Sequence, residues 1–245
     1  MPNNELLEGR HAVTEALRAG LTPEVIYLQK DLKEEQKNSV LEAAKKAGVR
    51  VRLCEKEKLD ALSATGRHQG VMAELAPLPY AEVADMLAAA RAKGEDPFLI
   101  LLDGIEDPHN LGAVIRSAHQ AGAHGVILPK NRSAGLNATV ARTSAGAVHF
   151  LPVAQVINLS RTMEELKKEG LWFACADMDG QVLFQQDLKG PIGLVIGSEG
   201  AGISPNVRKH CDFVVSIPMK GQIDSLNASV AAGILMFEVV RQRSL

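Results

Sequence analysis

The order of apolar and polar residues is most regular from residue 98 onward. There, short uninterrupted apolar runs alternate with segments whose apolar residues recur at helical spacing. Continuous apolar runs are typical of strands that are buried on both faces of a parallel sheet. We therefore predict an open, mostly parallel α/β sheet for residues 98–245. The expected strands are 98–102, 125–128, 150–153, 171–176, 192–196 and 213–217, and the expected helices are 111–121, 138–144, 159–168, 205–209 and 228–240.

The first 76 residues have shorter elements and predict a separate, small α/β domain. A segment with Pro77 and Pro79, followed by an alanine-rich helix at 81–92, favours a linker over residues 77–97. The sequence therefore predicts a domain at 1–76, a linker at 77–97 and a second domain at 98–245. In the first domain, the expected helices are 9–19, 33–47 and 57–64, and the expected strands are 25–28, 49–53 and 71–75.

Composition and charge exclude several classes of function. The net charge of -2 is unlike that of a general nucleic-acid binder, so any RNA contact must come from a local basic patch. Three separated cysteines form no CxxC pair and no metal-binding spacing, which predicts reduced thiols in a cytoplasmic protein without metal. The sequence has no HExxH or GxSxG motif, and no apolar stretch approaches the ~20 residues of a membrane span.

Three loops follow predicted strands and should meet at one edge of the sheet, where open α/β sheets bind ligands. They are residues 103–110, 197–204 and 218–227. In the first, we expect Asn110 to cap the following helix, with Arg116 in its second turn. From this segment alone, the simpler interpretation is that Arg116 is a solvated helix residue, because charged helix positions are usually at the surface.

The second loop has glycines on both sides of Glu199, and the third is a long polar loop between apolar elements. Glycines after a strand permit close approach to a ligand, although a structural glycine turn is the simpler alternative. Ser225 or Asn227 is expected to cap the last helix. Composition and spacing alone would support only a nucleotide-binding α/β protein.

Together the loops carry three motifs: N-x-G-A-x-x-R-S-A from Asn110, V-I-G-S-E-G-x-G-I from Val195, and I-P-M-x-G-x-x-x-S-L-N-A-S-V-A-A-G from Ile217. Their combination and order resemble the SpoU family of RNA 2′-O-ribose methyltransferases, in the SPOUT superfamily. The segments LEGRHAV (7–13) and HQGV (68–71) are similar to that family's RNA substrate-binding domain, which has an L30e-like fold. The resemblance covers nearly the whole chain.

The resemblance implies a deep trefoil knot, S-adenosylmethionine as cofactor, and a homodimer formed through the C-terminal domain. It places Arg116 at the ribose 2′-hydroxyl. Arginine stays protonated and is a poor base, so we expect Arg116 to bind phosphate and stabilise the developing alkoxide. By resemblance, the other catalytic candidates are Asn110, Glu199, Ser225 and Asn227, and the cofactor-binding candidates are Gly197, Gly202, Ile217, Pro218, Met219 and Leu226.

Within the family, the chain resembles the bacterial enzymes that methylate a guanosine in the peptidyl-transferase loop of 23S rRNA. Methylation of a tRNA or of another rRNA site is the alternative within this class. A non-catalytic RNA-binding ribosome-assembly factor is the alternative outside it. The candidate RNA contacts of the first domain, which are otherwise ordinary surface residues, are Arg10, His11, Arg67, His68 and Gln69.

Overall fold

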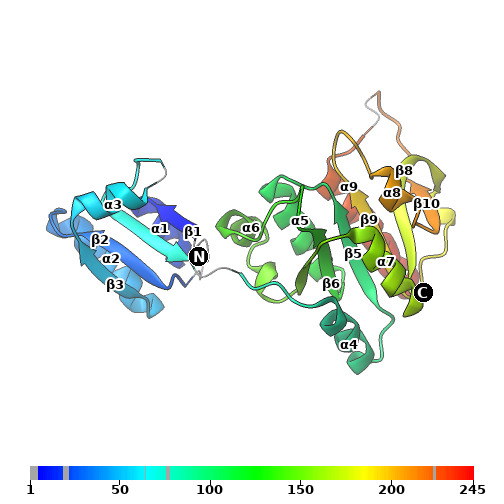
Figure 1. Ribbon diagram of the computed structural model, residues 1–245, viewed down its shortest axis with the longest axis horizontal. Helices are drawn as coiled ribbons and strands as arrows, with labels where there is room; N and C mark the ends of the chain where they lie inside the picture. Colours follow the sequence, from blue (N-terminus) through cyan, green and yellow to red (C-terminus); the bar gives the residue numbers. More distant parts are fainter. Residues whose placement is uncertain (1–4, 19–21, 64, 76–77, 223–224) are drawn as a thin grey trace. The chain divides into compact units, whose positions relative to one another are not determined.

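The computed structural model describes residues 5–18, 22–63, 65–75, 78–222 and 225–245. The chain divides into two compact units, Met1–Leu78 and Pro79–Leu245 (Figure 1). The boundary expected at Pro77 lies outside the described residues. Each unit has its own sheet and core, as the change in sequence pattern indicated.

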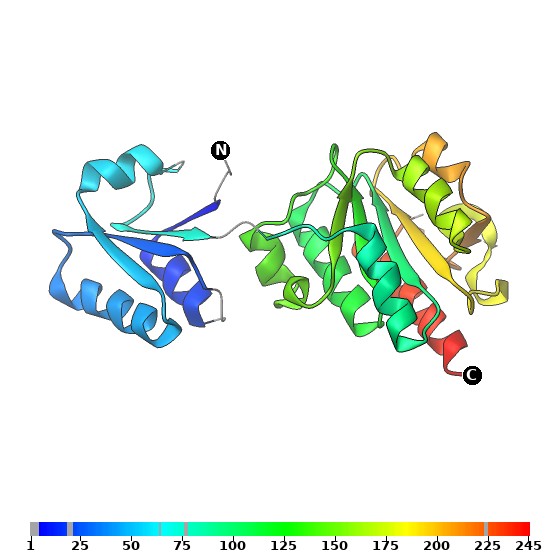
Figure 2. The ribbon, with the colours of Figure 1, turned by 60° about the horizontal axis from the view of Figure 1, so that its bottom comes forward.

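The first unit is a four-stranded sheet of order β1-β4-β2-β3 with helices on both faces (Figure 2). Val13, Val40 and Ile26 belong to the core under α1 and α2, whereas Leu59 of α3 packs with Tyr27 on the other face. The short edge strand β1 was not predicted, because four residues give too little pattern. The elements are β1 (Glu5–Glu8), α1 (Arg10–Arg18), β2 (Val25–Gln29), α2 (Glu34–Ala47), β3 (Arg50–Cys54), α3 (Lys56–Leu62) and β4 (Val71–Leu75).

The second unit confirms the predicted α/β architecture with a parallel sheet. Its six strands have the order β10-β8-β9-β5-β6-β7, and every pair is parallel. The deep knot implied by the resemblance stays a prediction. The elements are α4 (Val83–Lys93), β5 (Phe98–Asp103), α5 (Pro108–Gln120), β6 (Gly125–Pro129), α6 (Ala138–Thr143), η1 (Ala147–His149), β7 (Val153–Val156), α7 (Leu159–Lys168), β8 (Trp172–Val182), η2 (Leu183–Gln185), β9 (Ile192–Gly197), α8 (Pro205–Arg208), β10 (Phe213–Ser216) and α9 (Ala228–Arg243).

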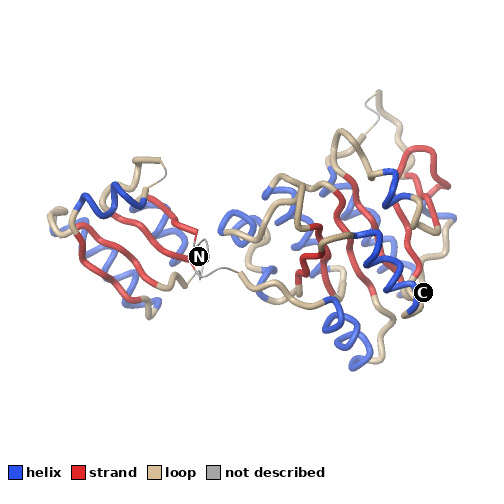
Figure 3. The backbone as a smooth tube through the Cα atoms, viewed as in Figure 1, coloured by secondary structure: helices blue, strands red, loops and turns tan. Residues whose placement is uncertain are grey.

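Helices cover both faces of this sheet, so its central strands are fully buried (Figure 3). Leu99 and Leu101 of β5 face the core that α4 and α7 share. Ile100 and Leu102, which alternate with them, are also buried. Helices α5 and α9 pack against each other, and α9 also contacts β9. This burial on both faces explains the uninterrupted apolar runs of the sequence.

The structure corrects the linker prediction. The 77–97 segment contains α4, whose Met86 and Leu87 are buried in the core of the second unit. Its amphipathic character was hidden because many of its residues are alanines. Strand β7 begins at Val153 and not at residue 150, because Phe150 follows the η1 turn and stacks on His119 with 5.8 Å between ring centroids.

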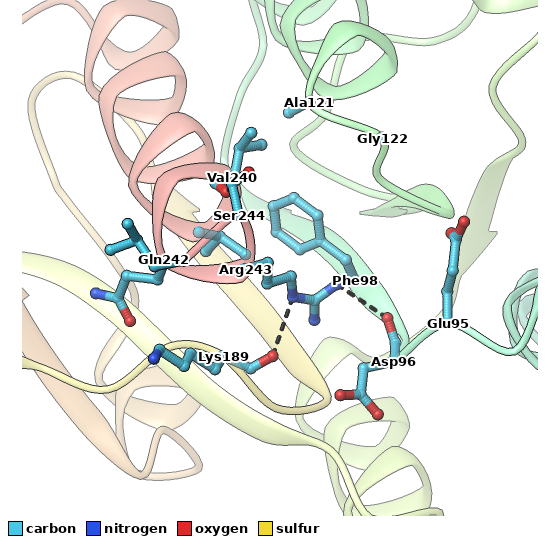
Figure 4. Close-up of a pocket in the computed structure, with 12 residues that line it drawn as sticks. Glu95, Asp96, Phe98, Ala121, Gly122, Lys189, Val240, Gln242, Arg243 and Ser244 are labelled. Atoms are coloured by element: carbon cyan, nitrogen blue, oxygen red, sulfur yellow. Dashed lines mark hydrogen bonds between the residues drawn. The ribbon is translucent and has the colours of Figure 1, made fainter.

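The last residues of α9 are tied to the amino-terminal edge of the sheet by Arg243 (Figure 4). Its guanidinium donates to the carbonyl oxygens of Asp96 (3.0 Å), Lys189 (3.1 Å) and Gly190 (2.8 Å). It also lies 5.3 Å from the centre of the Phe98 ring. Burial lowers the pKa of Arg243. This side chain joins the segments that enter β5 and β9, although it lies far along the sequence from both.

Candidate active site

The loops after β5 and β9 meet because these strands are parallel neighbours at the centre of the sheet. Asp103 and Gly197, the last residues of the two strands, are paired in register. Asp103 is buried, and its Oδ2 accepts a hydrogen bond of 2.7 Å from the backbone N–H of Ser204. The sequence did not single out Asp103. This carboxylate fixes the end of the 197–204 loop to the neighbouring strand.

Three predicted site residues, one from each motif, form a hydrogen-bonded triangle. Asn110 Nδ2 donates to Glu199 Oε1 at 3.0 Å, and Asn227 Nδ2 donates to Asn110 Oδ1 at 2.9 Å. Asn227 Nδ2 also donates to the same Glu199 oxygen, as does the backbone N–H of Ala228 at 3.3 Å. One carboxylate oxygen of Glu199 therefore holds the starts of α5 and α9 together. We call Asn110, Glu199 and Asn227 the site triangle.

The two helix starts are capped in different ways. Asn227 caps α9, since its Oδ1 accepts from the backbone N–H groups of Ser229 (3.0 Å) and Val230 (3.3 Å). The predicted cap at Asn110 is wrong: Asp107 caps α5 and Pro108 occupies its first turn. Proline is favoured there because its missing N–H would have no partner. Asn110 lies inside the helix, which frees its side chain for the site triangle.

The turn after β9 explains why Gly197 is a glycine. A Cβ at this position would lie 2.3 Å from the backbone carbon of Gly202 and 2.5 Å from the backbone nitrogen of Ile203. Ser198 and Gly202 exchange two backbone hydrogen bonds of 3.0 and 3.1 Å, and Gly202 has a φ of +64°. The turn folds directly back over the strand end. Gly197 is therefore needed for close packing of backbone on backbone, which is the structural alternative left open by the sequence.

A cavity of about 390 Å³ opens beside the site triangle, a size within the usual range for small-ligand sites. Its walls are mostly apolar, and Glu199 and Asp177 contribute carboxylates. Among the described residues that line it, none is a lysine or arginine. Pro218 is not among these lining residues. Five of the predicted cofactor residues line the cavity, together with the predicted Ser225: Gly197, Gly202, Ile217, Met219 and Leu226.

One wall of the cavity was not predicted. Strand β8 continues to Val182 instead of ending at residue 176, so that Asp177 and Met178 reach the cavity. Arg208 holds this extension: it pairs with Asp177 at 2.5 Å and with Asp179 at 2.7 Å. The hydrogen bond to Asp179 raises the pKa of Arg208. The strand was not predicted beyond residue 176 because this part of β8 is polar. It lies at the rim of the cavity, where its side chains are only partly buried.

Cys175 precedes the cavity-lining Ala176 on β8, and its neighbour in space is Cys211, which is distant in sequence. A hydrogen bond between Cys175 and Cys211 lowers the pKa of the Cys175 thiol and raises that of Cys211. Both are free thiols, as is Cys54. Within the described parts of the chain, there is no cluster of side chains that could hold a metal ion, and no helix is long and apolar enough to cross a membrane.

Among the described residues, no hydrogen bond or ion pair joins Arg116 to the site triangle. Arg116 lies six residues beyond Asn110 on α5, which corresponds to about 120° around the helix and roughly 9 Å along it. Its side chain is exposed, and among the described residues it has no hydrogen-bond or ion-pair partner. The guanidinium is therefore available to a group from outside the single chain.

The candidate RNA contacts of the first unit divide into two kinds. Arg10 is partly buried, whereas His11, Arg67 and Gln69 are exposed. His68 is buried, and both of its ring nitrogens are occupied: Nδ1 accepts from Gly70 N–H at 3.0 Å, and Nε2 lies 2.8 Å from Asp60 Oδ1. The structure thus corrects the interpretation of His68 as a surface contact. It supports the turn that contains Gln69, whose φ is +51°.

Comparison with known proteins identifies the family. Residues 97–237 match the SpoU rRNA Methylase family, and residues 6–81 match the RNA 2′-O ribose methyltransferase substrate binding domain. The chain belongs to the SpoU family. It is 45% identical over 247 residues to the 23S rRNA (guanosine-2′-O-)-methyltransferase RlmB of Ralstonia nicotianae, covering 100% of this chain and 98% of that protein.

Other SpoU relatives agree with this assignment. A Bacillus subtilis protein, YacO, named for the TrmH family of tRNA/rRNA methyltransferases, is 45% identical over 237 residues, covering 96% of this chain and 95% of its own. The crystal structure of the SpoU methyltransferase AviRb from Streptomyces viridochromogenes, in complex with AdoMet, has a TM-score of 0.68 at 27% identity. It matches 98% of this chain and 90% of its own. S-adenosylmethionine is therefore the cofactor of this SpoU chain.

Proposed function

We propose that this SpoU chain, an S-adenosylmethionine-dependent RNA 2′-O-methyltransferase, modifies a guanosine in the peptidyl-transferase loop of 23S rRNA. One observation carries the proposal: Glu199 lines the apolar cavity and also bonds Asn110 and Asn227. A cofactor in the cavity and a ribose at the site triangle would then be adjacent. The similarity to RlmB of Ralstonia nicotianae favours 23S rRNA and guanosine.

The cavity suits this cofactor in chemistry as well as in size. The apolar residues Ile196, Ile217 and Leu226 fit an adenine ring, and the carboxylates of Asp177 and Glu199 fit a ligand with a positively charged sulfonium and ammonium. We expect Gly197, Gly202, Pro218 and Met219 to complete its binding site. When bound, S-adenosylmethionine supplies a methyl group that is activated for transfer to an oxygen nucleophile.

The residues of the chain would position the ribose and stabilise charge. Arg116 is expected to bind the phosphate beside the target ribose and to stabilise the negative charge on its 2′-oxygen. The proton would pass to phosphate or water, because arginine remains protonated. Asn110 and Asn227 carry amides that can orient the ribose once the substrate competes for their hydrogen bonds. Ser225, exposed at the cavity, is the remaining candidate contact.

A homodimer through the second unit would supply the site triangle with an arginine from a second copy, which a single chain lacks. Val230 and Phe237 of α9 are each 50% exposed and lie seven residues apart, on one face of the helix. Arg116 is exposed on α5, which packs against α9. A second copy over this face would bury the apolar residues and bring an arginine near a site. Phe237→Asp should yield monomers in light scattering and inactive enzyme with normal cofactor binding.

The first unit is expected to hold the RNA through Arg10, His11, Arg67 and Gln69. The chain has few aromatic residues for base stacking, so phosphate and shape contacts should dominate and binding should weaken with salt. His68 would act through Gln69, and His68→Ala should raise the KM for RNA without changing cofactor affinity. We expect the enzyme to act in the cytoplasm.

The experiment that tests the function uses cofactor with a tritiated methyl group and separate pools of rRNA and tRNA. Label in 23S rRNA, mapped to one guanosine ribose, is the expected result. Label in tRNA alone would refute the rRNA substrate. Cofactor binding without label in any pool would favour a ribosome-assembly factor that does not catalyse. Arg116→Ala serves as the inactive control, because loss of an exposed side chain should leave the fold intact.

A further inference from the structure

One loop at the carboxyl-terminal edge of the second unit's sheet holds a non-glycine residue in the left-handed backbone conformation. Residues 130–133 (Lys-Asn-Arg-Ser) follow β6, and we call them the KNRS loop. Arg132 has a φ of +54°. The other described non-glycine residues with positive φ are Gln69 and Ala145. Ala145 follows the end of α6, where such a conformation is common. Arg132 follows no helix, so its conformation needs another explanation.

The KNRS loop is anchored at both ends. The backbone N–H of Lys130 donates to Val156 O at 2.8 Å, and that of Ala134, which is buried, donates to Ile105 O at 2.8 Å. Further on, Leu136 N–H donates to the hydroxyl of Tyr80 at 3.1 Å. The anchors hold the backbone while the Arg132 side chain stays exposed. A fixed backbone with an exposed long side chain is a preorganised contact.

The loop lies beside the elements that carry the site triangle. Ile105, its backbone partner, belongs to the loop that leads from β5 into α5, where Asn110 lies. Beyond the KNRS loop, α6 packs against the start of α5, since Thr143 Oγ1 approaches Pro108 O at 3.4 Å. The loop is thus a neighbour of the first motif at the carboxyl-terminal edge of the sheet.

The charge of the loop suits a polyanion. Lys130 and Arg132 are cationic, Asn131 is a polar donor, the Ser133 hydroxyl donates to Ala134 O at 3.2 Å, and the loop has no acidic residue. Neither cation has an ion-pair partner among the residues that the structure describes. The adjoining loop carries Glu106, which is exposed and directly follows Ile105, and Asp107, which is engaged in capping α5; the two cations of the KNRS loop itself leave it with a net positive charge. Arginine and lysine side chains of this kind bind phosphate oxygens of nucleic acids.

We propose that the KNRS loop binds the phosphate backbone of the RNA substrate, with Arg132 as its principal contact. This inference rests on the proposed function and adds a second RNA-binding surface, on the catalytic unit itself. The loop would place the target nucleotide against the site triangle independently of the first unit. Phosphate contacts orient a nucleic acid without reading its sequence, so the loop should act on all RNA substrates alike.

The test compares Arg132→Gly with wild type. Glycine adopts a φ of +54° freely, so the variant loses the guanidinium without strain and should keep or raise its Tm. We expect the Kd for RNA to rise about tenfold, as for loss of a charged hydrogen bond. The slope of log Kd against log salt should fall by roughly one. The affinity for S-adenosylmethionine should be unchanged.

Three further variants separate charge from conformation. Arg132→Lys keeps the charge and should restore part of the affinity, whereas Arg132→Asn tolerates the backbone conformation but should bind RNA as weakly as Arg132→Gly. Lys93→Ala removes an exposed cation at the end of α4, before β5 begins, and should bind RNA normally.

The outcomes distinguish this inference from the proposed function. An unchanged Kd and salt slope in Arg132→Gly would overturn the role of the KNRS loop, even if wild type methylates RNA. RNA binding without methylation by wild type would refute the proposed function, and the Kd ratio would still decide the role of the loop. Wild type that binds no RNA would refute both.

Discussion

Replacing Gly197 with alanine would put a methyl group where the returning chain already lies. The new Cβ would be 2.3 Å from the Gly202 carbonyl carbon, and an ordinary contact there needs about 3.4 Å, so the turn must move by about 1 Å. The atoms in the way are backbone and cannot rotate aside. Moving them strains the two Ser198–Gly202 hydrogen bonds and the 2.7 Å bond from Ser204 to Asp103.

Overpacking of this kind costs about 1–3 kcal/mol. For a domain of this size, that corresponds to a fall in Tm of roughly 2–12 °C. If only the turn distorts and the rest of the unit is unchanged, the same free energy weakens cofactor binding instead. The Kd for S-adenosylmethionine would then rise about 5- to 150-fold. Calorimetric titration with S-adenosylmethionine and thermal unfolding of the same samples would measure both quantities.

Gly200 is the matched control because it belongs to the same turn, lines the same cavity, and has no atom within 4 Å of the place that an added Cβ would take. Gly200→Ala should therefore leave Tm unchanged. A Gly197→Ala protein with wild-type Tm and wild-type cofactor affinity would refute the reasoning. It would mean that the backbone of Gly202 and Ile203 leaves room for a Cβ at position 197.

Three other predictions concern single side chains. Asn227→Ser keeps a side-chain oxygen that can cap α9 but loses the amide donors to Glu199 and Asn110, so turnover should fall at least tenfold while Tm changes little; a large loss of Tm would contradict this separation. Arg116→Lys should lower kcat strongly with unchanged cofactor affinity, because lysine lacks the planar fork; near-normal turnover would exclude the assigned role. Burial lowers the pKa of His124, so the unfolded chain binds its proton more tightly and stability should fall as pH drops below about 6.5. His124→Gln should show a smaller loss of Tm between pH 8 and pH 5, and an equal loss would be inconsistent with this origin.

The convergence of the three loops could be predicted from sequence because parallel strands end at the same edge of a sheet. The order of the strands could not, since nothing local to β9 indicates that it lies between β5 and β8. The apolar pattern therefore identified the elements that build the site. It did not indicate which of them are neighbours.

The errors at the site have local physical causes. Asn110 had the right residue type for a cap, but Asp107 followed by Pro108 is the stronger start. His68 was expected to be exposed because it lies in a polar loop, yet its ring is enclosed by Asp60 and Gly70. The role of Asp177 was missed because β8 becomes polar where it leaves the core.

The position of β9 has a consequence for synthesis of the chain. A ribosome delivers β5 long before β9, so the edge of β5 that faces β9 has no strand to pair with until Ile192–Gly197 emerges. The cavity then needs residues up to Ala231, and Arg243 can secure α9 only after β5 and β9 have both been made. A nascent chain should therefore be unable to bind cofactor until α9 has emerged, and truncation within α9 should give an aggregation-prone protein instead of a weakened enzyme.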